Sequence, residues 1–186
     1  MGKHGAEYER MPRDSYYTPD WVTKALLDCV TLPRKIWEPA CGQNYIVKSL
    51  YGRGYEARGT DVDGPLGIDF LTARVSPVDC VVTNPPFGVQ GKLAVQFIQH
   101  ALDLTETNCG MVAMLLPVDF DSGVTRRHLF ADHPAFSKKI VLTKRIRWVN
   151  LPQKAAGPKE NHAWFVWDWK NQGGATIAYA PLPETA

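Results

Sequence analysis

The sequence predicts an α/β fold with a doubly wound, mostly parallel sheet and helices on both faces. Short apolar runs alternate with segments whose apolar residues recur at helical spacing. Acidic or amide residues directly follow several of these runs, where the carboxyl ends of parallel strands meet. The chain has 186 residues and is 45% hydrophobic, enough for one sizeable core. We therefore expect a single domain over residues 1–186, with no separate target-recognition domain.

The first helix is expected directly after Tyr16-Tyr17-Thr18-Pro19. Thr18 is predicted to cap it and Pro19 to open it, because proline is favoured at the first helical position. One face of this helix is apolar and carries Trp21, Ala25, Leu26 and Cys29. A helix N-terminus also favours anions, so Thr18 has a second possible role beside a ligand carboxylate.

A strand, a glycine turn and a second helix are predicted over residues 35–50. Glu38 ends the strand, where its carboxylate is able to accept hydrogen bonds from an amino group. The backbone of Ala40, Cys41 and Gly42 would face a ligand at the carboxyl end of the sheet. Asn44 is the predicted N-cap of the helix that follows.

Two further acidic positions follow the glycine turn. A strand over residues 55–60 ends in Asp61, about 20 residues past the turn, where such folds place a ribose hydroxyl acceptor. Asp69 is able to bond an adenine amino group, with the Phe70 ring against the base. A single acid at a strand end is more often a solvated turn residue, but three after successive strands favour a nucleotide-like ligand.

The most informative motif is Asn84-Pro85-Pro86-Phe87, directly after the apolar run 79–83. The Asn84 side-chain oxygen and the Pro85 carbonyl are acceptors for both hydrogens of a planar amine, which would draw its nitrogen toward a tetrahedral shape. The prolines stiffen the backbone, and Phe87 offers a face on which a flipped base can stack. The alternative is an ordinary turn that closes a buried strand.

The remaining elements complete the alternation. A helix is predicted around residues 94–102 and strands over 111–116, 138–143, 162–169 and 176–179. Between residues 124 and 149, seven Lys or Arg residues face the single acid Asp132. This cluster, which contains Arg126, Arg145 and Arg147, predicts either a DNA-facing edge or a solvated surface. Residues 151–161 form a long polar loop, which would gate a pocket or touch DNA.

In this order of motifs, the sequence resembles the small DNA adenine-N6 methyltransferases of the phage and prophage type, which use S-adenosylmethionine. The resemblance covers about residues 16–169 and implies a class I, Rossmann-like methyltransferase fold. It implies a cofactor site made by Thr18, Glu38, Ala40, Cys41, Gly42, Asp61, Asp69 and Phe70. It also implies a late aromatic residue that encloses the flipped base, for which Trp148 is the candidate. The glycine turn departs from the family, because Gln43-Asn44 follows Gly42 where further glycine is common.

The sequence thus predicts methyl transfer from S-adenosylmethionine to adenine N6 in DNA, with base flipping. Three alternatives are methylation of RNA bases, methylation of a protein glutamine amide, and a nucleic-acid-binding module without turnover. The four cysteines form no metal-ligand spacing, so we expect no metal site and a reducing compartment. No apolar run reaches the length of a membrane span or a signal-peptide core, so we expect no membrane association and a cytoplasmic protein of a bacterium or phage-infected host. The oligomeric state and the target sequence are not predicted.

Overall fold

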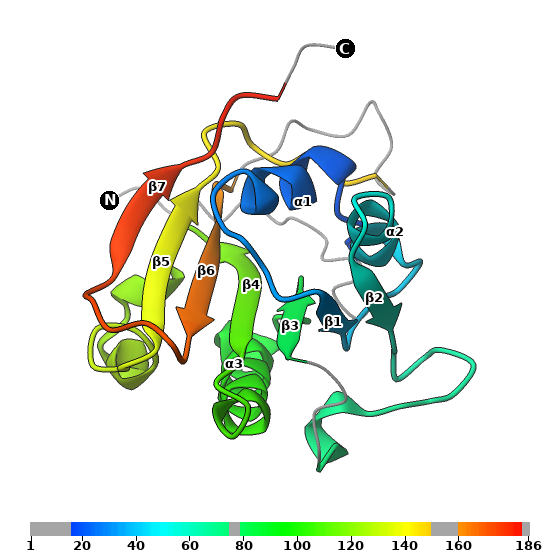
Figure 1. Cartoon of the computed structure of the whole chain (residues 1–186), viewed down its shortest axis with the longest axis horizontal. Helices are drawn as coiled ribbons and strands as arrows, with labels where there is room; N and C mark the ends of the chain where they lie inside the picture. Colours follow the sequence, from blue (N-terminus) through cyan, green and yellow to red (C-terminus); the bar gives the residue numbers. More distant parts are fainter. Residues whose placement is uncertain (1–15, 75–78, 150–159, 184–186) are drawn as a thin grey trace, which may run out of the picture.

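The computed structural model describes residues 16–74, 79–149 and 160–183. Within these ranges the strands form one seven-stranded sheet in the order β2-β1-β3-β4-β6-β5-β7 (Figure 1). The strands are β1 Lys35–Glu38, β2 Glu56–Gly59, β3 Cys80–Thr83, β4 Met111–Pro117, β5 Phe136–Val141, β6 His162–Asp168 and β7 Thr176–Tyr179. The predicted strands are therefore all present, and most of their ends differ from the predicted ones by one or two residues.

Most neighbouring strands of the sheet are parallel, and β6 is the exception. It is antiparallel to both β4 and β5, with Ala113 opposite Val166 and Ile140 opposite Trp164. The pairs β1–β2, β1–β3, β3–β4 and β5–β7 are parallel. The prediction of a mostly parallel sheet is confirmed, and the reversal of β6 is a feature that the apolar pattern did not predict.

Helices cover both faces of the sheet, as predicted (Figure 1). On one face lie α1 Asp20–Leu27 and α2 Tyr45–Tyr51, whose apolar residues share a buried cluster with Ile36 and Val82. On the other face lies α3 Lys92–Glu106, which packs into a second cluster with Val81 and Met114. Successive strand residues point to opposite faces, so the sheet separates two cores.

Two helix starts differ from their predictions. The N-cap of α1 is Pro19, with no side-chain cap bond, so Thr18 is not the cap and is instead 3% exposed. Asn44 does occupy the N-cap position of α2, but in a left-handed conformation (φ 63°) and without a side-chain cap bond. The backbone N–H of Val47 instead donates to the carboxyl group of Glu38. One orphan donor of the first turn is thus satisfied from the preceding strand.

The connections create a switch point between β1 and β3. From β1 the chain passes through α2 to β2 on one side, whereas β3 lies on the other side of β1. Ligands of doubly wound sheets bind outside the carboxyl ends of the strands at such a point. The ladder between β1 and β3 pairs Ile36 with Cys80 and Trp37 with Val81 only. Glu38 and Asn84 therefore lie at neighbouring strand ends where this ladder has stopped.

Some sequence predictions fall outside the described ranges. The polar N-terminal residues and most of the long loop over residues 151–161 are among them. Within the described ranges, no helix is both long and apolar enough to cross a bilayer.

Candidate active site

Glu38 brings an unpaired carboxylate oxygen to the carboxyl end of β1. The side chain is 3% exposed, and its Oε2 atom is buried without a hydrogen-bond partner among the described residues. Burial raises the pKa of Glu38 well above its ordinary range, against the lowering effect of the Val47 N–H, and the Asp61 carboxylate raises it further. A buried acceptor beside a second carboxylate suits a cationic donor such as an ammonium group.

The glycine turn after β1 is held by the end of β2. The Gly42 N–H donates to Asp61 Oδ2 at 2.9 Å, and the Asp63 N–H donates to Asp61 Oδ1 at 2.9 Å. Gly42 has φ 46°, a left-handed conformation that favours glycine. The Tyr17 ring stacks on Tyr45 at 5.4 Å, and a Cβ atom on Gly42 would lie 3.7 Å from Tyr17. The segment before α1 therefore covers the turn.

Asn84 follows the last residue of β3, and its amide is oriented by that same N-terminal segment. Its Nδ2 donates to the backbone carbonyl of Tyr16 at 3.1 Å. Because this bond uses an amide hydrogen, the Oδ1 atom is left as the acceptor on the opposite branch of the amide. The N-terminal segment thus contacts the glycine turn through Tyr17 and the Asn84 motif through Tyr16.

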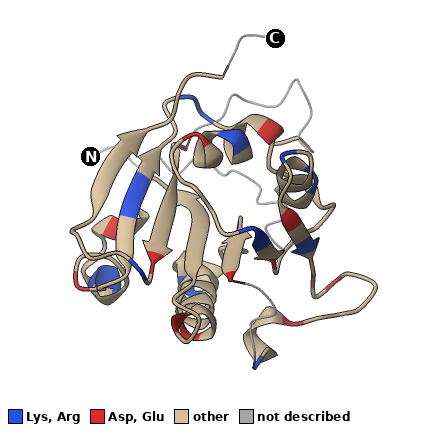
Figure 2. Cartoon of the chain, viewed as in Figure 1, with Lys and Arg blue, Asp and Glu red and all other residues tan. Residues whose placement is uncertain are grey.

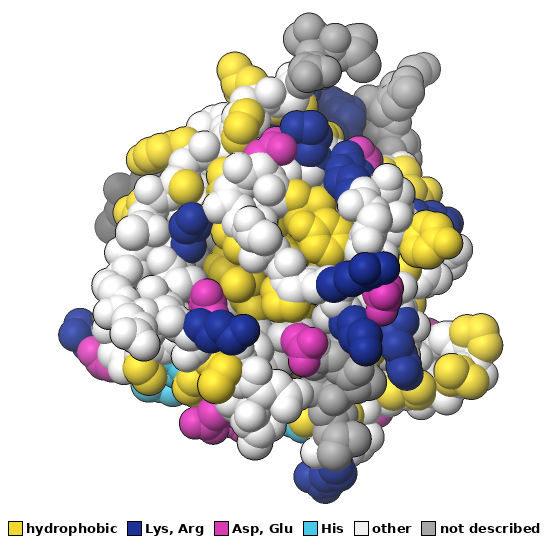
Figure 3. Space-filling view, viewed as in Figure 1, with side chains coloured by type: hydrophobic (Ala, Val, Ile, Leu, Met, Phe, Trp, Pro, Cys, Tyr) yellow, Lys and Arg dark blue, Asp and Glu magenta, His cyan; other side chains and the backbone are white. Residues whose placement is uncertain are grey.

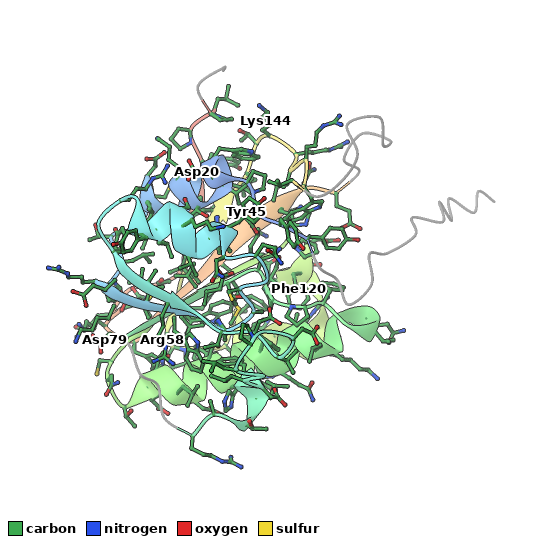
Figure 4. All side chains as sticks on the ribbon, turned by 90° about the vertical axis from the view of Figure 1, so that its right-hand side faces the viewer. Asp20, Tyr45, Arg58, Asp79, Phe120 and Lys144 are labelled. Atoms are coloured by element: carbon green, nitrogen blue, oxygen red, sulfur yellow. The ribbon has the colours of Figure 1, made fainter. Side chains whose placement is uncertain are left out.

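Phe87 of the same motif lies against a second aromatic ring. The Phe87 and Phe120 rings meet edge to face at 5.7 Å. Gly91 lies beside both, with φ 77°, and a Cβ atom there would come within 2.9 Å of Phe120 and 3.2 Å of Phe87. Phe120 follows β4, and Figure 4 labels it on the opposite side of the molecule from Asp79, which precedes β3. It is therefore at the same end of the sheet as Asn84.

Asp69 and Phe70 occupy different environments. The Asp69 carboxylate is exposed and accepts the Leu71 N–H at 3.0 Å, which caps the short helix η2 Phe70–Thr72. Phe70 is 2% exposed, and its ring packs against Trp37 and His100 at 5.2 and 4.9 Å. This conformation does not support a stacking face at Phe70, because the ring is enclosed by the core.

Trp148 lies close to the Asn84 motif through Tyr16. The Trp148 ring is 5.3 Å from the Tyr16 ring and 5.3 Å from the His162 ring. The Val149 N–H donates to the Tyr17 carbonyl at 3.1 Å, which ties this segment to the chain before α1. Burial lowers the pKa of His162 to about 4, so its ring is neutral near pH 7. The structure therefore brings Trp148 and Asn84 to the same region.

The basic cluster does not form one continuous edge. Lys139 pairs with Asp121 at 2.8 Å and Arg127 with Asp132 at 2.9 Å. Lys138 is next to Lys139 in β5, and adjacent strand residues point to opposite faces of the sheet. Lys138 therefore has a different acceptor, the Cys29 carbonyl. Figure 2 shows Lys and Arg spread over several elements, and on the face in Figure 3 they are interspersed with Asp and Glu. The exposed members near Trp148 in sequence are Lys144, Arg145 and Arg147, and for them the DNA-facing edge and the solvated surface both stay predictions.

Cys41 contributes a backbone N–H and a protonated thiol to the glycine turn. Burial, with the Glu38 and Asp61 carboxylates, raises the pKa of the Cys41 thiol to about 11, so the thiol stays protonated. Its N–H donates to the Thr60 carbonyl at 3.0 Å, which continues the β1–β2 pairing into the turn. Across the described ranges, no group of three or more His, Cys, Asp or Glu side chains comes together in a metal-binding arrangement.

Phe120 and the contacts of Tyr16 and Tyr17 were not predicted. The position of Phe120 four residues past the predicted strand 111–116 is a signal that points to the ligand edge. The contacts of the tyrosines depend on tertiary packing and leave no periodic signal.

Comparison with known proteins identifies the fold. No protein-family model and no curated protein matches the sequence. A Pyrococcus horikoshii protein, provisionally assigned as an RNA methyltransferase, is 17% identical with a TM-score of 0.58, over 84% of this chain and 87% of that one. An Agrobacterium tumefaciens protein, provisionally assigned as an O-methyltransferase, is 11% identical with a TM-score of 0.54, over 87% and 86%. The plantazolicin methyltransferase BpumL, solved with SAH, is 11% identical with a TM-score of 0.50, over 80% and 81%. The chain has the class I, Rossmann-like methyltransferase fold.

Proposed function

We propose that this protein transfers a methyl group from S-adenosylmethionine to the N6 amine of an adenine in DNA. The observation that carries the proposal is the orientation of Asn84 at the end of β3 by the Tyr16 carbonyl. This bond leaves the amide oxygen as an acceptor in the sequence Asn-Pro-Pro-Phe, beside the aromatic pair Phe87 and Phe120. An acceptor pair followed by a stacking face suits a planar amine on a ring.

The cofactor site is proposed at the carboxyl ends of β1 and β2. The unpaired oxygen of Glu38 fits the ammonium group of the cofactor, and Asp61 fits its ribose hydroxyls. The turn of Ala40, Cys41 and Gly42 would follow the methionine portion, with Thr18 nearby and Asp69 toward the adenine. When bound, the cofactor supplies an electrophilic methyl group on a sulfonium.

The chain's own contribution to the reaction is to bind, orient and polarise the amine. The Asn84 oxygen and the Pro85 carbonyl accept the two N–H groups, which localises the nitrogen lone pair. Phe87 stacks on the extruded base, and Trp148 closes the site from the side of Tyr16. Arg145 and Arg147 lie near Trp148 in sequence and are proposed to bind backbone phosphates.

Mass analysis of nucleosides tests the proposal directly. The protein would be incubated with isotope-labelled S-adenosylmethionine and, separately, with DNA, RNA and a glutamine-containing peptide. We expect labelled N6-methyladenine from DNA. If label appeared only in RNA or only in the peptide, that molecule would be the substrate in place of DNA. Cofactor binding without label in any of the three would favour a binding module without turnover.

A further inference from the structure

We propose that Arg126 binds a phosphate of the strand that carries the target base, from a position fixed by the Phe120 ring. Arg126 lies in the short helix η5 Val124–Leu129, directly after η4 Phe120–Ser122. The inference rests on the proposed function, because it requires a nucleic-acid substrate. It assigns to Arg126 the phosphate beside the target base, separate from the phosphates proposed for Arg145 and Arg147.

The guanidinium group of Arg126 is held against two neighbours. It lies 4.0 Å from the centre of the Phe120 ring, in a cation–π contact. It also lies against Gly123, where a Cβ atom would come within 2.9 Å of its Nη2 and 3.0 Å of its Nε. These contacts restrict a side chain that is otherwise flexible, so its planar fork of donors is oriented before any ligand arrives.

This arginine lacks an acceptor in the part of the chain that the structure describes. Its Nε atom is buried without a hydrogen-bond partner, and no ion pair to it occurs there. Two other basic residues of the cluster do have carboxylate partners, because Arg127 pairs with Asp132 and Lys139 with Asp121. A half-buried, oriented guanidinium without a carboxylate is suited to an anion that presents two oxygens side by side, as a phosphate does.

The position of Arg126 relative to Phe87 identifies which phosphate it serves. Phe120 contacts the Arg126 guanidinium on one side and the Phe87 ring at 5.7 Å on another. The Phe120 ring therefore lies between the Arg126 guanidinium and Phe87, whose ring is proposed to stack on the target base. A nucleotide whose base lies on Phe87 carries its phosphate nearby, and such contacts fix the register of a strand without reading its sequence.

The test compares Arg126→Met with Arg127→Met, two changes that remove the same charge at adjacent positions. Methionine keeps a long side chain for packing on Phe120. Binding to a fluorescently labelled DNA duplex is measured by anisotropy over a range of salt concentrations. For Arg126→Met we expect about tenfold weaker binding to all sequences and a salt slope reduced by about one. For Arg127→Met we expect wild-type affinity and slope.

Failure of this inference alone is distinguishable from failure of the function on which it rests. If Arg126→Met binds DNA with wild-type affinity and slope while the wild-type protein methylates DNA, the phosphate contact is refuted and the function stands. If the wild-type protein binds neither DNA nor RNA, both fail together. Should Arg126→Met unfold, Arg126→Lys keeps the charge without the planar fork. We expect its affinity to fall with an unchanged salt slope, and unchanged affinity would refute the role of the oriented fork.

Discussion

Replacing Glu38 with glutamine should stabilise the protein without ligand and weaken cofactor binding. The wild-type carboxyl group is buried, and its pKa is raised well above the ordinary value by that burial. An acid whose pKa is higher in the folded state loses stability as pH rises from its unfolded pKa, about 4.3, through the folded pKa. Glutamine has no proton to lose, so the variant should melt at a higher temperature than the wild type near pH 7. The difference should vanish below about pH 4.

The effect on cofactor binding has the opposite sign. Glu38 Oε2 has no partner among the described residues, so the proposed ammonium group would be its charged donor. A hydrogen bond between charged groups is worth about 1.5 to 3 kcal/mol, which corresponds to roughly 10- to 150-fold in affinity. Because the ammonium favours the ionised carboxyl, wild-type affinity should also rise with pH through the raised pKa of Glu38.

Titration calorimetry with S-adenosylmethionine and thermal unfolding without it measure the two effects. Glu56→Gln is the matched control, because Glu56 is an exposed residue of β2 that pairs with Arg34 at 2.9 Å. We expect the control to bind the cofactor as the wild type does. A Glu38→Gln protein that melts lower than the wild type at pH 7, or that binds the cofactor equally well, would refute this account of the carboxylate.

Three further predictions concern the other groups of the site. Asp61→Ala removes the acceptor of the Gly42 N–H and of the proposed ribose contact, so calorimetry should show cofactor affinity reduced by about tenfold or more; unchanged affinity would remove Asp61 from the site. Phe87→Ala should weaken DNA binding at the target base by about 1 to 3 kcal/mol, with a smaller loss in anisotropy titrations when the target adenine is mismatched and easier to extrude. Exchanging Arg145 and Arg147 for Glu should weaken binding to all DNA sequences alike and reduce its salt dependence. If neither the affinity nor its salt dependence changed, Arg145 and Arg147 would be solvated surface residues.

Much of the fold follows from local pattern. The strands that end at Glu38 and Thr83 carry consecutive apolar residues because they are buried on both faces, and the acid and the amide at their carboxyl ends mark the ligand edge. The antiparallel direction of β6 has no such local signal. Its residues Ala163–Trp167 are all buried, as in a central strand of either direction.

The candidate site can be proposed from sequence where its groups lie within one motif, such as Asn84-Pro85-Pro86-Phe87, and not where its contacts depend on packing. The basic cluster is compact along the sequence, but Lys138 and Lys139 point to opposite faces of the sheet and each has an acceptor in the protein. Phe70 follows Asp69, an acid expected at a strand end, yet Asp69 caps η2 and the Phe70 ring packs in the core against Trp37. The place of Phe120 beside Phe87 depends on the approach of the end of β4, which is distant in sequence from the motif, and on the close packing at Gly91.

The most direct test of the central claim is the rate of N6-methyladenine formation by Asn84→Ala in a single turnover, with cofactor affinity measured in parallel. The Asn84 oxygen is proposed to act chiefly on the amine as it becomes tetrahedral, so its loss should affect the rate and not cofactor binding. We expect a folded variant with wild-type cofactor affinity and a rate about a hundredfold to a thousandfold lower. A folded Asn84→Ala protein that forms N6-methyladenine at the wild-type rate would contradict the proposed mechanism.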